Sequence, residues 1–243
     1  MSDTKKKTLC ENVRTVGFIC PMDCELDAVV RLFEEKKTVR YAGMDFYEGR
    51  IASCRTVAVK CGVGKVFAAM AAQALILGFS PDLVINTGVA GNLSDGLTIG
   101  DVVVSESVVQ HDMDTSPLGD PVGLISGINK VFIESDAAAA ALMCEVLSAL
   151  GIRYARGVVA SGDVFVATDE KRSFIREHFG ASCAEMEGAA VGQVCYANGV
   201  RFLVLRALSD DADGSSPDDF PAYCVKVSET SSRVIAAFMK ALS

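Results

Sequence analysis

Residues 83–91 read Leu-Val-Ile-Asn-Thr-Gly-Val-Ala-Gly. The first five form a nearly continuous apolar run, which is typical of a strand buried on both faces of a sheet. In open α/β sheets, ligands bind beyond the carboxyl ends of the strands. This stretch therefore predicts a buried strand, followed at residues 88–91 by small residues that face a ligand site.

Strand and helix patterns alternate on both sides of this stretch. We expect the other strands at residues 16–21, 46–51, 56–61, 101–110, 153–161, 183–186 and 201–208. We expect helices at residues 24–36, 65–77, 136–150, 169–178, 188–198 and 218–242, with Asp136 as the N-cap of the third. This alternation favours a mostly parallel or mixed sheet that helices cover on both faces.

The domain organisation expected from the sequence is simple. No repeat, low-complexity tract or linker rich in Pro, Gly or Ser divides the chain, so we expect one domain over residues 16–243. The polar start, residues 1–15, is expected to be a disordered tail. The longest irregular stretch, residues 114–127, carries several Pro and Gly residues and is expected to be a working loop.

The composition limits the classes of partner. Hydrophobic residues make up 50% of the 243-residue chain and charged residues 22%, which is typical of a globular protein. The formal net charge of −8 disfavours nucleic acid and anionic membranes as partners, because an acidic surface repels phosphate groups. A small neutral or zwitterionic substrate is compatible with that charge.

The cellular location expected from the sequence is the cytoplasm. The nine cysteines are odd in number and include no Cys-x-x-Cys pair, which favours free thiols in a reducing compartment. The charged N-terminus is not followed by an apolar segment long enough for a signal peptide, and no uninterrupted apolar run could span a membrane.

Most residues that could carry chemistry fall directly after predicted strands. They are Met22, Asp23 and Glu25; Gly62, Val63 and Gly64; Gly162, Asp163 and Phe165; Glu185, Met186 and Glu187; and Ser209, Asp210 and Asp211. Several carboxylates among small and apolar residues suit acid–base work on an uncharged substrate better than attack by cysteine or lysine. Taken singly, each carboxylate also fits a structural role, since acidic side chains are favoured at helix starts and in turns.

Two other motifs are weak. Residues 62–65, Gly-Val-Gly-Lys, lack the third glycine of a dinucleotide fingerprint and the spacing of a P-loop. Residues 111–114, His-Asp-Met-Asp, place one histidine among alternating carboxylates, which is not a coordination set for a metal. We therefore expect neither a metal nor a cofactor, and a dinucleotide-dependent oxidoreductase is the most distant alternative.

Several blocks, taken together, carry a resemblance to a known superfamily. They lie at residues 21–25 (Pro-Met-Asp-Cys-Glu), 62–65, 86–91, 100–105, 111–114, 161–165, 185–190 (Glu-Met-Glu-Gly-Ala-Ala) and 206–210 (Arg-Ala-Leu-Ser-Asp). In this order and spacing, the chain resembles the purine nucleoside and uridine phosphorylase superfamily and, within it, the 5′-methylthioadenosine/S-adenosylhomocysteine nucleosidases. The resemblance implies a three-layer α/β/α fold with a central mixed, twisted β-sheet.

The resemblance also implies a role for each matching position. Glu25 would hold and activate the attacking water, and Asp210, oriented by Ser209, would supply acid to N7 of the adenine. The implied binding residues are Glu187, Met186 and Arg206 for the ribose, Phe165 and Val166 for the base, and Met22 and Val63 for the 5′-thio group.

The chain departs from these nucleosidases at three places. Val89 stands where they usually carry serine, so a hydrogen bond from that side chain is missing. For the aromatic residue that closes the 5′ pocket we choose Phe220, with Tyr223 as the alternative. Residues 115–119 replace a Thr-Ala-Phe-Gly run. In the family the loop at 111–127 reaches the neighbouring subunit's site, which implies a homodimer.

One position favours hydrolysis over phosphorolysis. Related phosphorylases carry an arginine two residues before Gly88, where this chain has Asn86. A phosphate dianion calls for a bidentate arginine, and Glu25 near the anomeric carbon would repel it. The sequence thus favours hydrolysis of the N-glycosidic bond of 5′-thio-substituted adenine nucleosides. A phosphorylase, a hydrolase of another adenine or futalosine-type nucleoside, and a non-catalytic nucleoside sensor stay open as alternatives.

Overall fold

The structure is a computed structural model that describes residue 9, residues 11–210, residue 212 and residues 220–243; at 220–226 and 228 it describes the helix but not the side chains. The strands are β1 (Thr15–Cys20), β2 (Glu34–Tyr41), β3 (Met44–Ile51), β4 (Cys54–Lys60), β5 (Leu83–Asn92), β6 (Val102–Gln110), β7 (Phe132–Glu134), β8 (Tyr154–Ser161), β9 (Ala181–Glu185) and β10 (Arg201–Asp210). The helices are α2 (Asp23–Val30), α3 (Lys65–Phe79), α4 (Ala137–Ala149), α5 (Asp169–Phe179), α6 (Gly188–Asn198) and α7 (Phe220–Leu242), with a short 3-10 turn, η1 (Ser116–Leu118).

The described strands form one mixed sheet in the order β10-β6-β8-β9-β5-β1-β4-β3-β2, with β7 added beside β6. β5 pairs in parallel with β1 on one side and with β10 on the other. β10 also pairs antiparallel with β6, and β9 antiparallel with the end of β5. These pairings close β5, β10, β6, β8 and β9 into a ring, a feature that the sequence patterns did not indicate.

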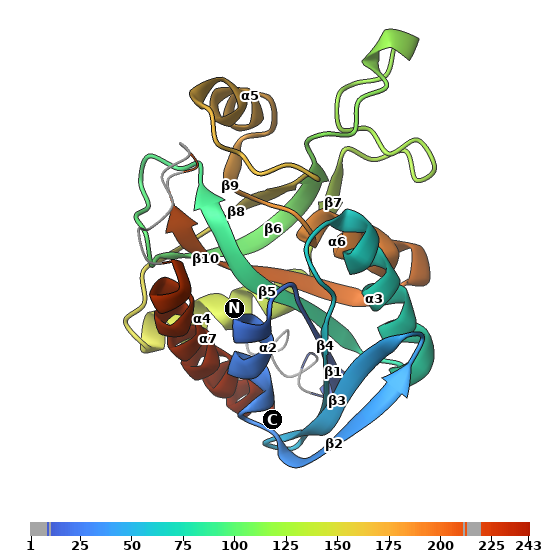
Figure 1. Ribbon diagram of the computed structural model, residues 1–243, viewed down its shortest axis with the longest axis vertical. Coiled ribbons are helices and arrows are strands. Elements are labelled where there is room, and N and C mark those ends of the chain that lie inside the picture. The colour runs from blue at the N-terminus through green and yellow to red at the C-terminus, as the bar shows by residue number, and fades with distance from the viewer. Residues whose placement is uncertain (1–8, 10, 211, 213–219) are drawn as a thin grey trace.

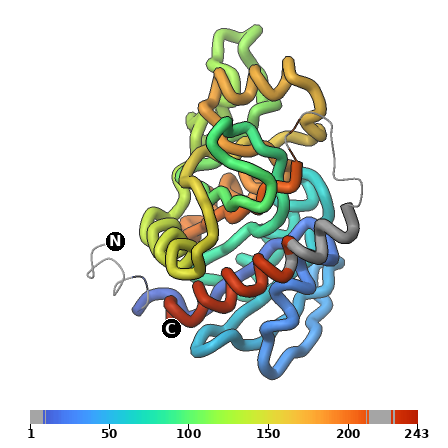
Figure 2. The backbone as a smooth tube through the Cα atoms, turned by 90° about the vertical axis from the view of Figure 1, so that its left-hand side faces the viewer, coloured from blue at the N-terminus to red at the C-terminus, as the bar shows by residue number. Residues whose placement is uncertain are grey.

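Helices cover the sheet on both faces (Figure 1). α2, α4 and α7 pack on one face, and Figure 2 shows α7 lying across it. α3 and α6 pack together on the other face. The three-layer arrangement expected from the sequence is therefore confirmed. α5 and the segment around η1 project beyond one end of the sheet (Figures 1 and 2).

β5 is buried on both faces, as its apolar run predicts. Leu83 and Ile85 belong to the apolar cluster under α4 and α7, whereas Val84 belongs to the cluster under α3 and α6. Alternate side chains of one strand thus reach two separate cores. This double burial fixes the register of β5 and, with it, the position of the residues that follow.

Two expectations about local structure are corrected. The helix expected at residues 24–36 ends at Val30, and residues 34–41 form β2 instead. The charged run at 34–37 has helical propensity, but its pairing with β3 at the edge of the sheet prevails, and charge is common on such edge strands. Within the expected tail at residues 1–15, two of the residues that the structure describes are packed, because Leu9 and Val13 are both buried in the cluster under α2 and α7.

No helix in the described part of the chain is both long and apolar enough to cross a membrane.

Candidate active site

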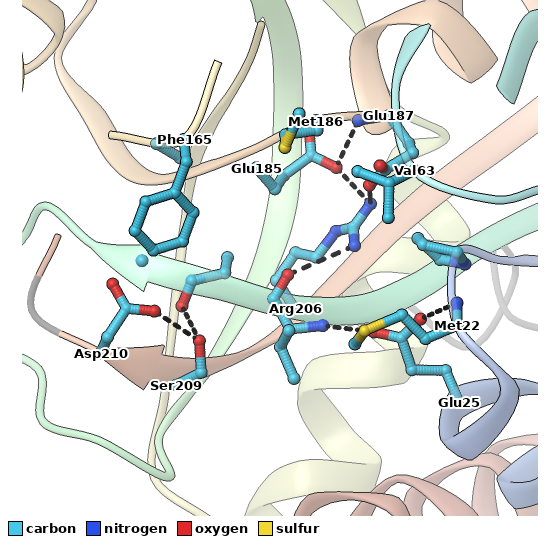
Figure 3. A pocket seen from close by; sticks show the side chains of 15 residues that line it. Met22, Glu25, Val63, Phe165, Glu185, Met186, Glu187, Arg206, Ser209 and Asp210 are labelled. Atoms are coloured by element: carbon cyan, nitrogen blue, oxygen red, sulfur yellow. Dashed lines mark hydrogen bonds and ion pairs between the residues drawn. The ribbon is translucent and has the colours of Figure 1, made fainter. Parts of the chain in front are cut away.

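A cavity of about 340 Å³ lies where the loops after several strands meet, a volume within the range of small-molecule pockets. It is lined by Pro21, Met22, Glu25, Val63, Val89, Ala90, Gly91, Phe165, Ala184, Glu185, Met186, Glu187, Arg206, Ser209 and Asp210. In Figure 3, Phe165, Ser209 and Asp210 lie toward one end of the cavity, and Met22, Glu25 and Val63 toward the other. Glu25 and Asp210, far apart in sequence, therefore share one cavity.

The topology explains this meeting of loops. β1, β4, β5 and β10 run in one direction, and β6, β8 and β9 run against β5 and β10. The carboxyl ends of β5 and β9 meet where Gly91 pairs with Ala184. Loops of both strand groups consequently converge on one cavity, although the sheet is not parallel throughout.

Glu25 is held by backbone amides. It is the third residue of α2, and its Oε2 accepts the N–H of Met22 at 2.8 Å, as in a capping box. Its Oε1 accepts the N–H of Val89 at 3.0 Å. Burial raises the pKa of Glu25 to about 7, although Arg206 and both amides favour the ionised form. A carboxylate with such a pKa can exchange a proton near neutral pH.

Arg206 is the centre of a buried ionic cluster. Its Nη2 donates to Asn86 and Glu185 and lies 3.5 Å from Oε2 of Glu187, while its Nη1 donates to the carbonyl of Val89 at 3.3 Å. The side chains of Arg206, Glu185 and Glu187 are each at least 96% buried. Among the described residues that line the cavity, Arg206 is the only lysine or arginine.

Glu187 faces the cavity from the residue before α6. Its Oε1 accepts the N–H of Gly64 at 2.9 Å, at the start of α3. Burial raises the pKa of Glu187, Arg206 opposes the shift, and the nearby Glu185 reinforces it. Three carboxylates thus surround one guanidinium, so the cluster carries net negative charge when they are ionised.

The opposite end of the cavity is organised around Asp210. Its Oδ2 accepts the hydroxyl of Ser209 at 2.6 Å, and its Oδ1 accepts the N–H of Ala212 at 2.9 Å. The pairing of β10 with β5 shifts register between Leu208 and Asp210, and such bulges commonly re-aim a side chain next to a site. A Cβ at Gly91 would lie 2.9 Å from Oδ1 of Asp210, so glycine leaves room for this carboxylate.

Comparison with known proteins identifies the family. A sequence profile described as the phosphorylase superfamily matches residues 15–240. The chain belongs to the phosphorylase superfamily. A 5′-methylthioadenosine/S-adenosylhomocysteine nucleosidase from Shewanella halifaxensis is 36% identical over 228 residues, which are 93% of this chain and 99% of the relative. The resemblance to these nucleosidases that the sequence motifs carry is therefore confirmed.

Solved structures of the superfamily match over nearly the whole chain. A nucleosidase of the same description from Neisseria meningitidis, in complex with methylthio-immucillin-A, has a TM-score of 0.89 and 33% identity, with 94% of this chain and 99% of that chain covered. Futalosine hydrolase of Helicobacter pylori has a TM-score of 0.88 and 34% identity, with 94% and 98% covered.

In this phosphorylase-superfamily member, most of the site residues expected from the sequence line the cavity. Val166 instead lines a smaller adjoining cavity, together with Phe165, Met186 and Asp210. The side chains of Phe220 and Tyr223 lie outside the part of the chain that the structure describes. In the 111–114 motif, Oδ1 of Asp112 accepts a hydrogen bond from Nζ of Lys65 at 2.6 Å.

The sequence patterns indicated neither the ion pair between Arg206 and Glu185 nor the contact between Arg206 and Asn86. Glu185 lies at the end of a strand pattern, which marked it as a candidate, but nothing in the sequence indicated that it binds Arg206. In the sequence, Asn86 was noted only because related phosphorylases carry an arginine at this position. Its Nδ2 donates to the carbonyl of Ile19 at 3.0 Å, so its amide bridges β1 and Arg206.

The packing around Gly88 generates a prediction. A Cβ there would lie 2.4 Å from Nη1 of Arg206 and 2.7 Å from Oε1 of Glu25, so Gly88→Ala must displace a buried ion. We expect it to lower the free energy of unfolding by about 1–3 kcal/mol, measured by urea denaturation. Gly96→Ala is the matched control, since its Cβ would meet only Oγ of Ser94 at 3.9 Å. Equal midpoints for both variants would contradict the packing described.

Proposed function

We propose that the chain hydrolyses the N-glycosidic bond of 5′-thio-substituted adenine nucleosides, 5′-methylthioadenosine and S-adenosylhomocysteine, and releases adenine and the thioribose. One observation carries the proposal. A cluster of carboxylates around an already paired arginine shares a cavity with Asp210. The names of the relatives and the analogue bound to the Neisseria meningitidis structure support the same reaction.

The carboxylate cluster suits the sugar. Breaking the bond between C1′ and N9 leaves positive charge on the ribose, which nearby negative charge stabilises in a partly dry cavity. Glu25 in its ionised form takes a proton from the attacking water as the water oxygen bonds to C1′. Glu187 accepts hydrogen bonds from the ribose hydroxyls, with Met186 on the same wall. Glycoside hydrolases divide work between two carboxyl groups in a comparable way.

Asp210 suits the departing base. The electron pair of the broken bond goes to adenine, and a proton from Asp210 to N7 neutralises it. The hydroxyl of Ser209 orients this carboxyl group. Phe165 is 59% exposed beside the cavity, where its ring can stack on a bound base, and the backbone of Val166 would read the edge of that base.

Water, and not phosphate, is the acceptor in this proposal. Arg206, the cation in the described cavity wall, already binds Glu185 and Asn86 and cannot offer a free bidentate fork. A phosphate dianion would also have to approach Glu25 and Glu187. The charge of the site therefore disfavours phosphorolysis.

The 5′ substituent would lie toward Met22 and Val63, which line the cavity at the end opposite Asp210. Either Phe220 or Tyr223 would cover it. The amide of Val89, and not a side-chain hydroxyl, holds Glu25 here. A futalosine-type nucleoside is a second candidate substrate, favoured by the likeness to futalosine hydrolase.

Adenine release tests the proposed function. The purified chain is incubated in phosphate-free buffer with 5′-methylthioadenosine, S-adenosylhomocysteine, 5′-deoxyadenosine and futalosine, and free base is measured by chromatography. We expect adenine from the thio-substituted nucleosides without added phosphate. Release of base only after phosphate is added would contradict the proposal, and unchanged substrates after long incubation would favour a non-catalytic sensor.

Substitution of the two reacting carboxyl groups generates a prediction. Glu25→Gln and Asp210→Asn each remove an acid–base group but keep its shape, so we expect kcat to fall roughly 10²–10⁴-fold. Binding of a non-hydrolysable thio-substituted analogue, measured by calorimetry, should persist in both. Normal turnover in either variant would remove that residue from the mechanism.

We also propose that the chain acts as a homodimer in the cytoplasm. Val66, Phe67 and Met70 form an exposed apolar stripe along α3, and Val63 at its start is 52% exposed while lining the cavity. Asp112, at the start of the 111–127 segment, forms an ion pair with Lys65, the first residue of α3. A second copy covering this stripe would also close the cavity. The described cysteines are free thiols, which fits a reducing compartment.

Analytical ultracentrifugation tests the dimer. We expect twice the mass of the 25.6-kDa chain for the wild type, and a monomer for the double variant Phe67→Glu, Met70→Glu, because each charge would be buried without a partner. Ile99→Glu, exposed in the loop between β5 and β6, is the control and should stay dimeric. A monomeric wild type would overturn this part of the proposal.

A further inference from the structure

Glu185 ends β9 in the wall of the cavity, and no step proposed above uses its carboxylate. The group is buried and accepts hydrogen bonds on both oxygens. Its donors are Nη2 of Arg206, the hydroxyl of Ser161, and the amides of Glu187 at 3.1 Å and Gly188 at 2.8 Å. Ser161 lies beside it because β8 and β9 are parallel neighbours and pair Ser161 with Glu185.

These contacts complete the start of α6. The first amides of a helix have no partner within the helix, and the N-cap side chain usually accepts one of them. Glu187 occupies the N-cap position of α6 but makes no side-chain cap. Glu185 instead accepts the amide of Gly188, and the hydroxyl of Ser161 accepts that of Ala189 at 2.7 Å.

Because Glu185 and Ser161 cap the start of α6, the Glu187 carboxylate is not needed there and can face the cavity. It accepts the amide of Gly64, the residue after Val63, and lies only at the limit of hydrogen-bond distance from Arg206. Glu185 takes the close ion pair with Arg206 instead. One carboxylate thus neutralises the arginine and caps the helix, while the other two stay directed at the substrate.

We propose that Glu185, supported by Ser161, is a positioning residue for the reaction: it anchors Arg206 and the start of α6 so that Glu187 and Glu25 stay directed at the sugar. This role rests on the proposed function. Without Glu185, the guanidinium would be drawn to the two carboxylates that the substrate needs.

The same arrangement predicts a change in pH dependence. Burial raises the pKa of Glu25 and Glu187, and the charge of Glu185 adds to this rise while Arg206 opposes it, so removal of Glu185 lets Arg206 lower the pKa of both. Glu25 accepts a proton only when ionised, so kcat/KM of the wild type falls as pH drops through about 7. The ionisable groups around Glu185 are Arg206 on β10, Glu25 on α2, Glu187 after β9, Cys183 on β9 and His111 after β6.

The test compares pH profiles of kcat/KM for adenine release by the wild type, Glu185→Gln and Ser161→Ala. We expect Glu185→Gln to lose roughly 10²-fold on the alkaline plateau, as misplaced substrate-binding groups do, and its acid-side decline to move to lower pH. Ser161→Ala removes two hydrogen bonds, to Glu185 and from the amide of Ala189, but no charge, so we expect about a tenfold loss with the decline in its wild-type position. Glu229→Gln, exposed on α7, is the control for loss of a carboxylate.

The outcomes separate this role from the proposed function. An inactive wild type would overturn both. An active wild type with an unchanged Glu185→Gln profile, or one that is lowered equally at every pH, would overturn the positioning role alone. If thermal melting shows that Glu185→Gln does not fold, the Ser161→Ala variant tests the positioning role instead. An unchanged kcat/KM in Ser161→Ala overturns the role, and a tenfold loss at an unaltered melting temperature supports it.

Discussion

The structure of the site depends on the ion pair between Arg206 and Glu185. A buried guanidinium requires acceptors, because an unpaired charge in the interior is strongly destabilising. Here Glu185 and Asn86 provide them from two neighbouring strands. The cavity wall consequently contains a cation that is already paired, and the carboxylates of Glu25 and Glu187 set the charge of this part of the cavity.

The pairing of β5 with β10 leaves space for the ion pair between Arg206 and Glu185. β5 and β10 are parallel neighbours, and their register places Arg206 beside Gly88. Any Cβ at that position would collide with the guanidinium and with Glu25. The buried apolar run of β5 fixes this register, since a slip by one residue would exchange the side chains that face the two cores. The apolar run at residues 83–87 therefore fixes both the packing of the sheet and the place of the buried charges in the site.

Much of this arrangement was predictable from the sequence, and the failures have physical causes. The position of Glu25 at a helix start and of Asp210 at the end of a buried strand follows from local patterns. The strand β2 was missed because pairing with β3 outweighs the helical propensity of its charged residues. The ring closure of the sheet depends on antiparallel pairings between distant strands, and the contacts of Glu185 depend on the pairing of β8 with β9 and on a side chain of β10. No local periodicity in the sequence records these long-range contacts.

In the proposed reaction, the charge of the cavity admits water and excludes an anion at C1′. This exclusion is tested most directly by identifying the sugar product formed from 5′-methylthioadenosine in saturating phosphate, using ³¹P nuclear magnetic resonance at high enzyme concentration. We expect free thioribose and no phosphorus signal other than inorganic phosphate. A sugar 1-phosphate formed in proportion to the adenine released would contradict this expectation.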